Sequence, residues 1–300
     1  MIPFATYSLP QSETRQGLLL VGADGVIGSA LATCLRQAGT PFFATSRRVQ
    51  QPTAQLLPLD LQADPASWSL PAGLGTAYLC AAVCRLDQCR REPEHSYQIN
   101  VERMVLLAER LAAEGCFIVF LSTNRVFDGR QPHVAADAPY SPTSEYGRQK
   151  ASAEQRLLAA CPQTAIVRLS KVLPANDALL QGWKNDLLQG RAIQPFHDVV
   201  MAPVALSSVV SLLRLIGERR QGGIWQITAL QDISYAEAAR QICSHLGCDP
   251  ALVQARSYRD AGLHEEIYLQ HSTLEVSRLQ RDLGLTLPSA QAVIEMTVNP

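Results

Sequence analysis

The chain contains 300 residues, 47% of them hydrophobic and 18% charged, with a formal net charge of −1 at pH 7. This composition is typical of a globular protein and excludes a general electrostatic attraction to nucleic acid or to an anionic membrane. No apolar run reaches the roughly 18 residues of a membrane-spanning helix, and residues 1–16 lack the basic and apolar regions of a secretory signal. We therefore expect a cytoplasmic protein with no membrane and no nucleic-acid partner, in which residues 1–16 are a leader.

The first predicted elements are a strand at 18–21, a glycine-rich turn and an amphipathic helix. The turn has G-x-x-G-x-x-G spacing, and apolar residues at helical spacing follow it. Small residues let the backbone approach a pyrophosphate, and N–H groups at the helix start stabilise its charge. A tight turn that binds nothing is the alternative. The cofactor contacts predicted here are Gly22, Gly25, Val26, Ile27 and Gly28.

The strand predicted at 41–46 ends in two cations, Arg47 and Arg48, with no acid beside them. In dinucleotide-binding α/β units an acid at this point favours the free ribose hydroxyl of NAD, and a cation favours the 2′-phosphate of NADP. Guanidinium groups suit phosphate, so we predict NADP(H) as the cofactor. The alternative is a pair of solvated loop arginines.

Strands and helices alternate further along the chain. Strands are predicted at 54–60, 75–83, 116–123 and 164–172, with helices at 95–115 and 144–162. This alternation predicts an α/β fold, a doubly wound parallel sheet of the Rossmann type. Ligands bind at the carboxyl ends of such strands, where Gly22, Arg47, Asp60, Ala81 and Thr123 all fall.

Tyr146 and Lys150 stand one turn apart on the helix predicted at 144–162. A tyrosine with a pKa of about 10 is a poor acid–base catalyst at pH 7. A lysine four residues on brings a positive charge close, so we expect Lys150 to lower the pKa of Tyr146 and to reach the cofactor ribose. Thr123 would hold the carbonyl oxygen that Tyr146 protonates. The alternative is a half-buried helix tyrosine and a surface lysine.

The chain has eight cysteines, three of them close together at Cys80, Cys84 and Cys89. A metal site is one interpretation of this cluster. Because no CxxC pair occurs and Cys80 ends an apolar run, we instead expect buried, reduced thiols and no metal.

The segments GADGVIG, LSTNRVFDG and YGRQK together resemble those of the extended short-chain dehydrogenase/reductases, and within them the dTDP-4-dehydrorhamnose reductase group. The resemblance runs from Leu18 to the C-terminus and implies a catalytic trio of Thr123, Tyr146 and Lys150. The expected reaction is the reduction of a 4-keto-6-deoxy sugar on a nucleoside diphosphate by NADPH. The other cofactor contacts that the resemblance implies are Asp60 and Leu61 at the adenine, Ala81 and Ala82 at the ribose side, and Tyr146 and Lys150 themselves.

Two departures from the pattern of this group concern the substrate. Asn124 and Arg125 replace an acid and a phenol, and Tyr268 stands where the family has an arginine that contacts the diphosphate. We therefore expect a different sugar or a different nucleotide. Arg125 either pairs with substrate or faces solvent, and Trp183 and Phe196 either face the sugar nucleotide or belong to the core. The predicted substrate contacts are Arg125, Lys171, Trp183 and Phe196.

The length of the chain predicts one large domain with a smaller lobe. We expect 17–170, joined by 198–228, to bind the cofactor, and 171–197 with 229–300 to form a mixed α/β substrate lobe. The resemblance adds a possible homodimer. Two other functions stay open: a nucleotide-sugar epimerase or dehydratase that recycles its hydride, and a non-catalytic NADP-binding subunit.

Overall fold

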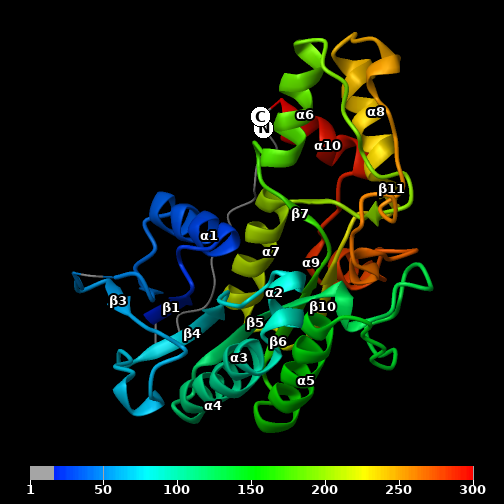
Figure 1. The fold of residues 1–300 in the computed structure, drawn as a ribbon. Helices are drawn as coiled ribbons and strands as arrows, with labels where there is room; N and C mark the ends of the chain where they lie inside the picture. Colours follow the sequence, from blue (N-terminus) through cyan, green and yellow to red (C-terminus); the bar gives the residue numbers. More distant parts are fainter. Residues whose placement is uncertain (1–16, 50, 300) are drawn as a thin grey trace.

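The computed structural model describes residues 17–49 and 51–299, and a parallel sheet of seven strands lies at its centre (Figure 1). In spatial order the strands are β10 (Gly223–Ile227), β6 (Ala165–Leu169), β5 (Phe117–Thr123), β4 (Leu74–Leu79), β1 (Gly17–Val21), β2 (Phe42–Ser46) and β3 (Leu56–Pro58). The chain runs outward from β1 to β3 and then returns to β4 on the other side of β1. The predicted doubly wound topology is confirmed, and its switch point, where ligands bind in such sheets, lies between β1 and β4.

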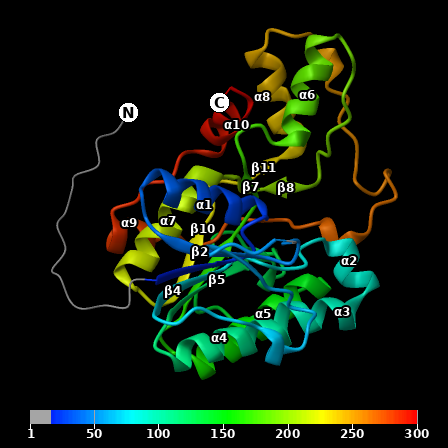
Figure 2. The same cartoon turned by 90° about the vertical axis from the view of Figure 1, so that its left-hand side faces the viewer.

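Helices cover both faces of the sheet (Figure 2). One face carries α3 (Pro93–Tyr97), α4 (Met104–Ala113) and α5 (Glu145–Ala160), and the other carries α1 (Val26–Gln37) and α7 (Leu206–Arg219). Successive strand residues point to opposite faces, so Leu19 packs toward α4 while Leu20 packs toward α1. This is why the strands are continuously apolar rather than alternating.

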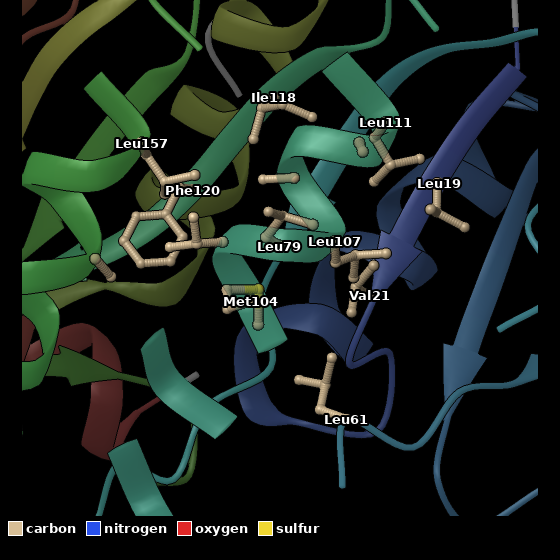
Figure 3. Close-up of a cluster of buried hydrophobic side chains, with 14 of the residues drawn as sticks. Leu19, Val21, Leu61, Leu79, Met104, Leu107, Leu111, Ile118, Phe120 and Leu157 are labelled. Atoms are coloured by element: carbon tan, nitrogen blue, oxygen red, sulfur yellow. The ribbon is translucent and has the colours of Figure 1, made fainter. Parts of the chain in front are cut away.

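The core beneath α4 and α5 is shown in Figure 3. Leu107 and Leu111 of α4 and Leu157 of α5 lie against Ile118 and Phe120 of β5, and each is at most 2% exposed. Helix α5 carries Tyr146 and Lys150, the predicted catalytic pair. It packs on the sheet at Phe120. The position of α5 therefore depends on this core.

Both edges of the sheet are short or covered. At one edge, β3 has three residues and ends in Pro58. At the other, the guanidinium of Arg278 from α9 (Ser277–Leu283) lies 3.7 Å from the centre of the Trp225 ring. It donates to Ile224 O at 2.8 Å and to Gly222 O at 3.0 Å, which occupies carbonyls along β10.

A smaller lobe stands above the carboxyl ends of the strands (Figures 1 and 2). Its helices α6 (Ala178–Leu188), α8 (Tyr235–His245) and α10 (Ala290–Val298) pack around their own apolar cluster. Two small sheets join it to the rest: β7 (Val172–Leu173) with β9 (Val204–Ala205), and β8 (Val200–Met201) with β11 (Ile233–Ser234). A capping box between Ser234 and Glu237 begins α8.

The long helix predicted at 95–115 is not a regular α-helix. A π-helical turn at Gln98–Arg103 separates α3 from α4. Asn100 lies in this turn, and its side chain bonds to the backbone of Val83 and to Gln149. Such turns occur often at functional sites, and this one faces the switch point.

Within the described part of the chain, none of the helices has the length and apolarity required to cross a membrane. The predicted leader, residues 1–16, lies outside the described residues.

Candidate active site

The glycine turn connects β1 to α1 at the switch point. Gly22 has φ +84°, and a Cβ there would lie 2.7 Å from the backbone nitrogen of Ala81. A Cβ on Gly28 would lie 2.2 Å from Gly22 O. The fold requires glycine at both positions, whether or not a ligand binds. A larger residue at Gly22 would clash with the loop after β4, and one at Gly28 would clash with the turn itself.

Gly25 differs from its neighbours because the protein does not require a glycine there. Its φ is −78°, and the nearest atom to an added Cβ is 3.5 Å away. Val26 beside it is 58% exposed. A position where a Cβ would meet no clash, a helix N-terminus without a side-chain cap and an exposed apolar residue together fit a dinucleotide, whose pyrophosphate needs close approach to backbone N–H groups.

The next strand ends place the other predicted cofactor residues around this turn. Arg47 and Arg48 directly follow β2 and are both exposed. The Nε atom of Arg48 lies 3.6 Å from the carboxylate of Asp24, which belongs to the glycine turn. Both guanidinium groups are accessible to solvent at this strand end.

Asp60 and Leu61 follow β3, and Ala81 and Ala82 follow β4. The Asp60 carboxylate accepts from Gln62 N at 2.9 Å, so it stabilises its own loop. Leu61 is only 7% exposed and belongs to the core, so its side chain offers little surface to a ligand. Both alanines are half-buried beside the switch point.

Thr123 and Tyr146 open into one cavity above the sheet. The Thr123 hydroxyl, at the end of β5, accepts a hydrogen bond from Arg125 N at 3.2 Å. Tyr146 lies in the first turn of α5, whose start is fixed by the side chain of Ser144 accepting from Gly147 N. The strand end and the helix start therefore bring a hydroxyl and a phenol to the same space.

Lys150 is buried, which excludes the alternative of a surface charge. It is 2% exposed, and its Nζ atom lies 4.0 Å from the centre of the Phe120 ring. Burial lowers its pKa to about 8, while the nearby carboxylate of Glu154 acts in the opposite direction. The hydrogen bonds of the described residues include none between Lys150 and Tyr146.

The expectation that Lys150 lowers the pKa of Tyr146 is wrong for the protein without ligands. Burial raises the pKa of Tyr146 well above its ordinary value, and the charge that acts to lower it belongs to Arg125. The Lys150 ammonium lies over the Phe120 ring, and Lys150 is not among the charges that act on the pKa of Tyr146. At neutral pH the phenol is protonated.

Arg125 lies next to Tyr146 because its backbone packs against the start of α5. A Cβ on Gly147 would lie 2.2 Å from Arg125 O, so the glycine permits this contact. The Arg125 guanidinium is half-buried and donates to Glu266 O at 2.7 Å and Ile267 O at 3.2 Å. It lines the cavity rather than facing solvent.

Asn100 and Gln149 are structural partners of the site that the sequence did not single out. Asn100 accepts from Val83 N at 2.8 Å, donates to Val83 O at 2.9 Å and donates to Gln149 at 2.8 Å. It thereby fixes the loop after β4 to α5. The available signal was a polar residue on the apolar side of a predicted helix, because a buried amide needs specific partners.

The cavity has a volume of about 610 Å³ and is lined by both parts of the molecule. Aromatic rings of Trp183, Phe196 and Tyr235 form part of its wall, and Trp183 meets Tyr235 edge to face at 6.3 Å. Three cations line it, Arg125, Lys171 and Arg256, and no carboxylate of the described residues does. All four predicted substrate residues, Arg125, Lys171, Trp183 and Phe196, are among the lining residues.

The expectation for the cysteines needs one correction. Cys89 is buried, but Cys84 is exposed and lines the cavity beside Tyr146. The loop after β4 turns outward at Cys84 to form the rim, which the apolar run before it did not indicate. Among the described residues, no cluster of three possible metal ligands is found.

The doubly wound sheet, the glycine turn and the phenol beside a cationic cavity define the class as a Rossmann-type α/β protein of the reductase and dehydrogenase kind. Residues 16–300 match the family model described as the RmlD substrate binding domain. The chain therefore belongs to that family of reductase-type nucleotide-sugar enzymes.

Individual relatives are consistent with this assignment. The chain is 25% identical over 286 residues to the "Probable low-salt glycan biosynthesis reductase Agl14" of Haloferax volcanii, covering 91% of this chain and 94% of that protein. It is 26% identical over 248 residues to the dTDP-4-dehydrorhamnose reductase of Mycolicibacterium smegmatis, covering 80% and 72%. The dTDP-4-dehydrorhamnose reductase of Bacillus anthracis, solved in complex with NADP, has a similar fold, with a TM-score of 0.77, 18% identity and coverage of 93% and 97%.

Proposed function

We propose that the protein is an NADPH-dependent reductase of a nucleotide-linked 4-keto-6-deoxy sugar. The observation that carries this proposal is the shared cavity, where Thr123 and Tyr146 meet a wall of three cations and three aromatic rings. A sugar nucleotide combines rings that stack on aromatic faces with phosphates that pair with cations. The family and the reductases among the relatives support the same reaction class.

In this proposal the chain's own residues hold the carbonyl and supply the proton, and the bound cofactor supplies hydride. Tyr146 is protonated at neutral pH and donates its hydrogen to the carbonyl oxygen, and the Thr123 hydroxyl holds that oxygen in place. The charge of Arg125, which acts to lower the pKa of Tyr146, stabilises the phenolate that is left, and Lys150 reaches the cofactor ribose. The glycine turn with Val26 and Ile27 holds the pyrophosphate, and Asp60, Leu61, Ala81 and Ala82 border the adenosine half.

The preference for NADP(H) over NAD(H) rests on Arg47 and Arg48. Both are exposed at the end of β2, and Asp24 is the acid that lies near Arg48. We expect NADPH to bind more tightly than NADH, and replacement of both arginines by alanine to remove most of that difference. Fluorescence titration with the two reduced cofactors measures it. Equal affinities in the native protein would contradict the assignment.

The activity test mixes the protein with NADPH and a panel of nucleotide-linked 4-keto-6-deoxy sugars. The absorbance of the reduced nicotinamide should fall with the native protein and not with a Tyr146→Phe variant that still binds NADPH. No fall with any substrate would overturn the reductase. Conversion of a sugar nucleotide without net cofactor use would favour the epimerase or dehydratase alternative instead.

The proposal also assigns cofactor binding and substrate binding to two different parts of the chain. Residues 17–170 with 198–228 bind the cofactor, and 171–197 with 229–300 bind the substrate. We also propose a cytoplasmic protein that forms a homodimer. Light scattering of the purified protein at several concentrations tests the oligomeric state.

A further inference from the structure

We propose that Arg256, together with Lys171, binds the diphosphate of the substrate and replaces the arginine that the family carries at the position of Tyr268. The inference rests on the proposed function, because it names the part of a sugar nucleotide that this cavity recognises. It assigns a role to Arg256, a residue whose surrounding sequence has no motif.

The first support is the balance of charge in the cavity. Three cations line it without a carboxylate among the described residues. Arg125 is already engaged, because its guanidinium donates to two backbone carbonyls at 2.7 and 3.2 Å. None of the ion pairs among the described residues involves Lys171 or Arg256. Two cations that line one cavity, without a carboxylate of the described chain beside them, give it a positive potential that attracts an anion.

The second support is the way in which the chain places Arg256. Segment 252–256 runs alongside segment 193–197 through four backbone hydrogen bonds of 2.8–3.1 Å, including Arg256 N to Pro195 O and His197 N to Arg256 O. The Arg256 guanidinium lies 5.5 Å from the centre of the Phe196 ring. The paired backbone and the Phe196 ring together place the Arg256 guanidinium at the cavity wall.

Residues that follow Arg256 hold the same segment from the other side. The Asp198 carboxylate accepts from Tyr258 N at 3.0 Å and from the Ser257 hydroxyl. Tyr258 is 3% exposed and stacks on Tyr268, with ring centres 5.6 Å apart. The residue that stands where the family has its arginine therefore supports the segment that carries Arg256.

Lys171 completes the pair from the sheet side. Lys171 lies just after the carboxyl end of β6. Its backbone is held there because its carbonyl accepts a hydrogen bond from Val204 N at 2.9 Å. The Lys171 ammonium, from the segment that directly follows β6, and the Arg256 guanidinium, from segment 252–256, thus face one cavity. A diphosphate carries enough charge and oxygen atoms for both, and Phe196 and Tyr235 lie nearby for the attached rings.

The test measures binding of UDP, dTDP, GDP and CDP by calorimetry on the full chain saturated with NADP, alongside the corresponding nucleosides. We expect at least one diphosphate to bind, and Arg256→Gln and Lys171→Met each to weaken it about tenfold or more. Nucleoside affinity should not change. The matched control is Arg259→Gln, an exposed arginine three residues on that does not line the cavity, which should change affinity less than twofold.

Three results would overturn the inference: no binding of any diphosphate to the native protein, native affinity in Arg256→Gln, or equal losses for diphosphate and nucleoside. Arg256 is exposed and Lys171 half-buried, so thermal unfolding should confirm that both variants fold. The outcome is separable from that of the proposed function. Binding that depends on Arg256 without any NADPH oxidation would keep the inference and remove the reductase, and oxidation unaffected by both variants would do the reverse.

Discussion

Gly25 and Gly28 occupy one turn, but a methyl group would meet very different surroundings at each. At Gly28 it would lie 2.2 Å from a backbone oxygen, and at Gly25 the nearest atom is 3.5 Å away. We expect Gly28→Ala to lower the free energy of unfolding by about 1–3 kcal/mol. Gly25→Ala should leave it within about 0.5 kcal/mol but weaken NADPH binding about tenfold or more. Urea denaturation and cofactor titration measure the two effects, and unchanged NADPH affinity in Gly25→Ala would show that the space is not used by a pyrophosphate.

Lys150 predicts how activity depends on pH. Burial lowers its pKa to about 8, so the ammonium is charged below that pH and loses its proton above it. Because we propose that the charged Lys150 holds the cofactor ribose, kcat/KM for reduction should be level from pH 6 to 7 and fall above about 8. Initial rates across the range give the profile. A profile that rises through pH 8 would show that neutral Lys150 is the active form.

The proposed catalytic residues could be singled out from the sequence, but their electrostatics could not be predicted from it. Spacing on a helix indicates that Tyr146 and Lys150 share a face, and that holds in any structure. The pKa of each group depends on burial, which requires the packing of Phe120 against α5 and of Arg125 against Gly147. Arg256 was missed for a related reason, because its position depends on a backbone pairing with residues about 60 positions earlier.

At the level of elements, α5 is joined to the sheet by a buried ionic network. Glu154 of α5 is 0% exposed and Arg168 of β6 is 1% exposed, and Arg168 Nη2 donates to Glu154 at 2.7 Å. Ser122 of β5 and Tyr140 also donate to Glu154, and Gln226 of β10 accepts from Arg168 at 3.2 Å. The helix that carries Tyr146 is therefore held by side chains from three strands and the loop after β5.

Removal of one member of this network should be costly. Arg168→Met leaves a carboxylate buried without its counterion, so we expect unfolding to become easier by about 3–5 kcal/mol. The double variant with Glu154→Met removes both charges and should recover more than half of that loss. Urea denaturation of the native protein, of Arg168→Met, of Glu154→Met and of the double variant completes the cycle. If the double variant loses the sum of the two single losses, the residues are not coupled.

Most elements could be predicted because their signals are local. Strands β1, β4, β5 and β6 and helices α1, α5 and α8 lie where hydrophobic period, caps and glycines place them. The π-helical turn before α4 could not be predicted, because Asn100 selects it through contacts with Val83 and Gln149. The small sheets of the upper lobe, each with strands of two residues, carry too short a pattern to be seen in the sequence.

For the whole molecule, segment 264–275 connects the two parts across the mouth of the cavity. Asn124 donates to the Ser272 hydroxyl at 2.9 Å, Arg125 donates to the carbonyls of Glu266 and Ile267, and Arg90 pairs with the Glu266 carboxylate at 2.9 Å. The two residues that depart from the family pattern, Asn124 and Arg125, thus both bind this segment. The sequence alone did not indicate this role. Where the family has an acid and a phenol, this chain has two residues that hold segment 264–275 in place.

Arg125→Met should loosen this segment. The part-buried carbonyls of Glu266 and Ile267 lose their donors, at a cost of about 1–3 kcal/mol in local opening, so amide hydrogen exchange over 264–272 should accelerate at least about fivefold. Arg130→Met, which removes an exposed cation of the same region, is the control and should not change exchange there. Unchanged exchange in Arg125→Met would mean that Asn124 and Arg90 hold the segment without it.

The protected borders of the central sheet limit how two copies can meet. A three-residue strand that ends in proline offers little for another backbone to join, and a guanidinium already occupies carbonyls on the opposite border. Continuous sheets that extend from one molecule into the next are therefore disfavoured, as are the fibrous deposits that begin in that way. Any symmetric pair of these molecules would have to associate through helix surfaces, and its stability would depend on side-chain complementarity rather than on shared backbone hydrogen bonding.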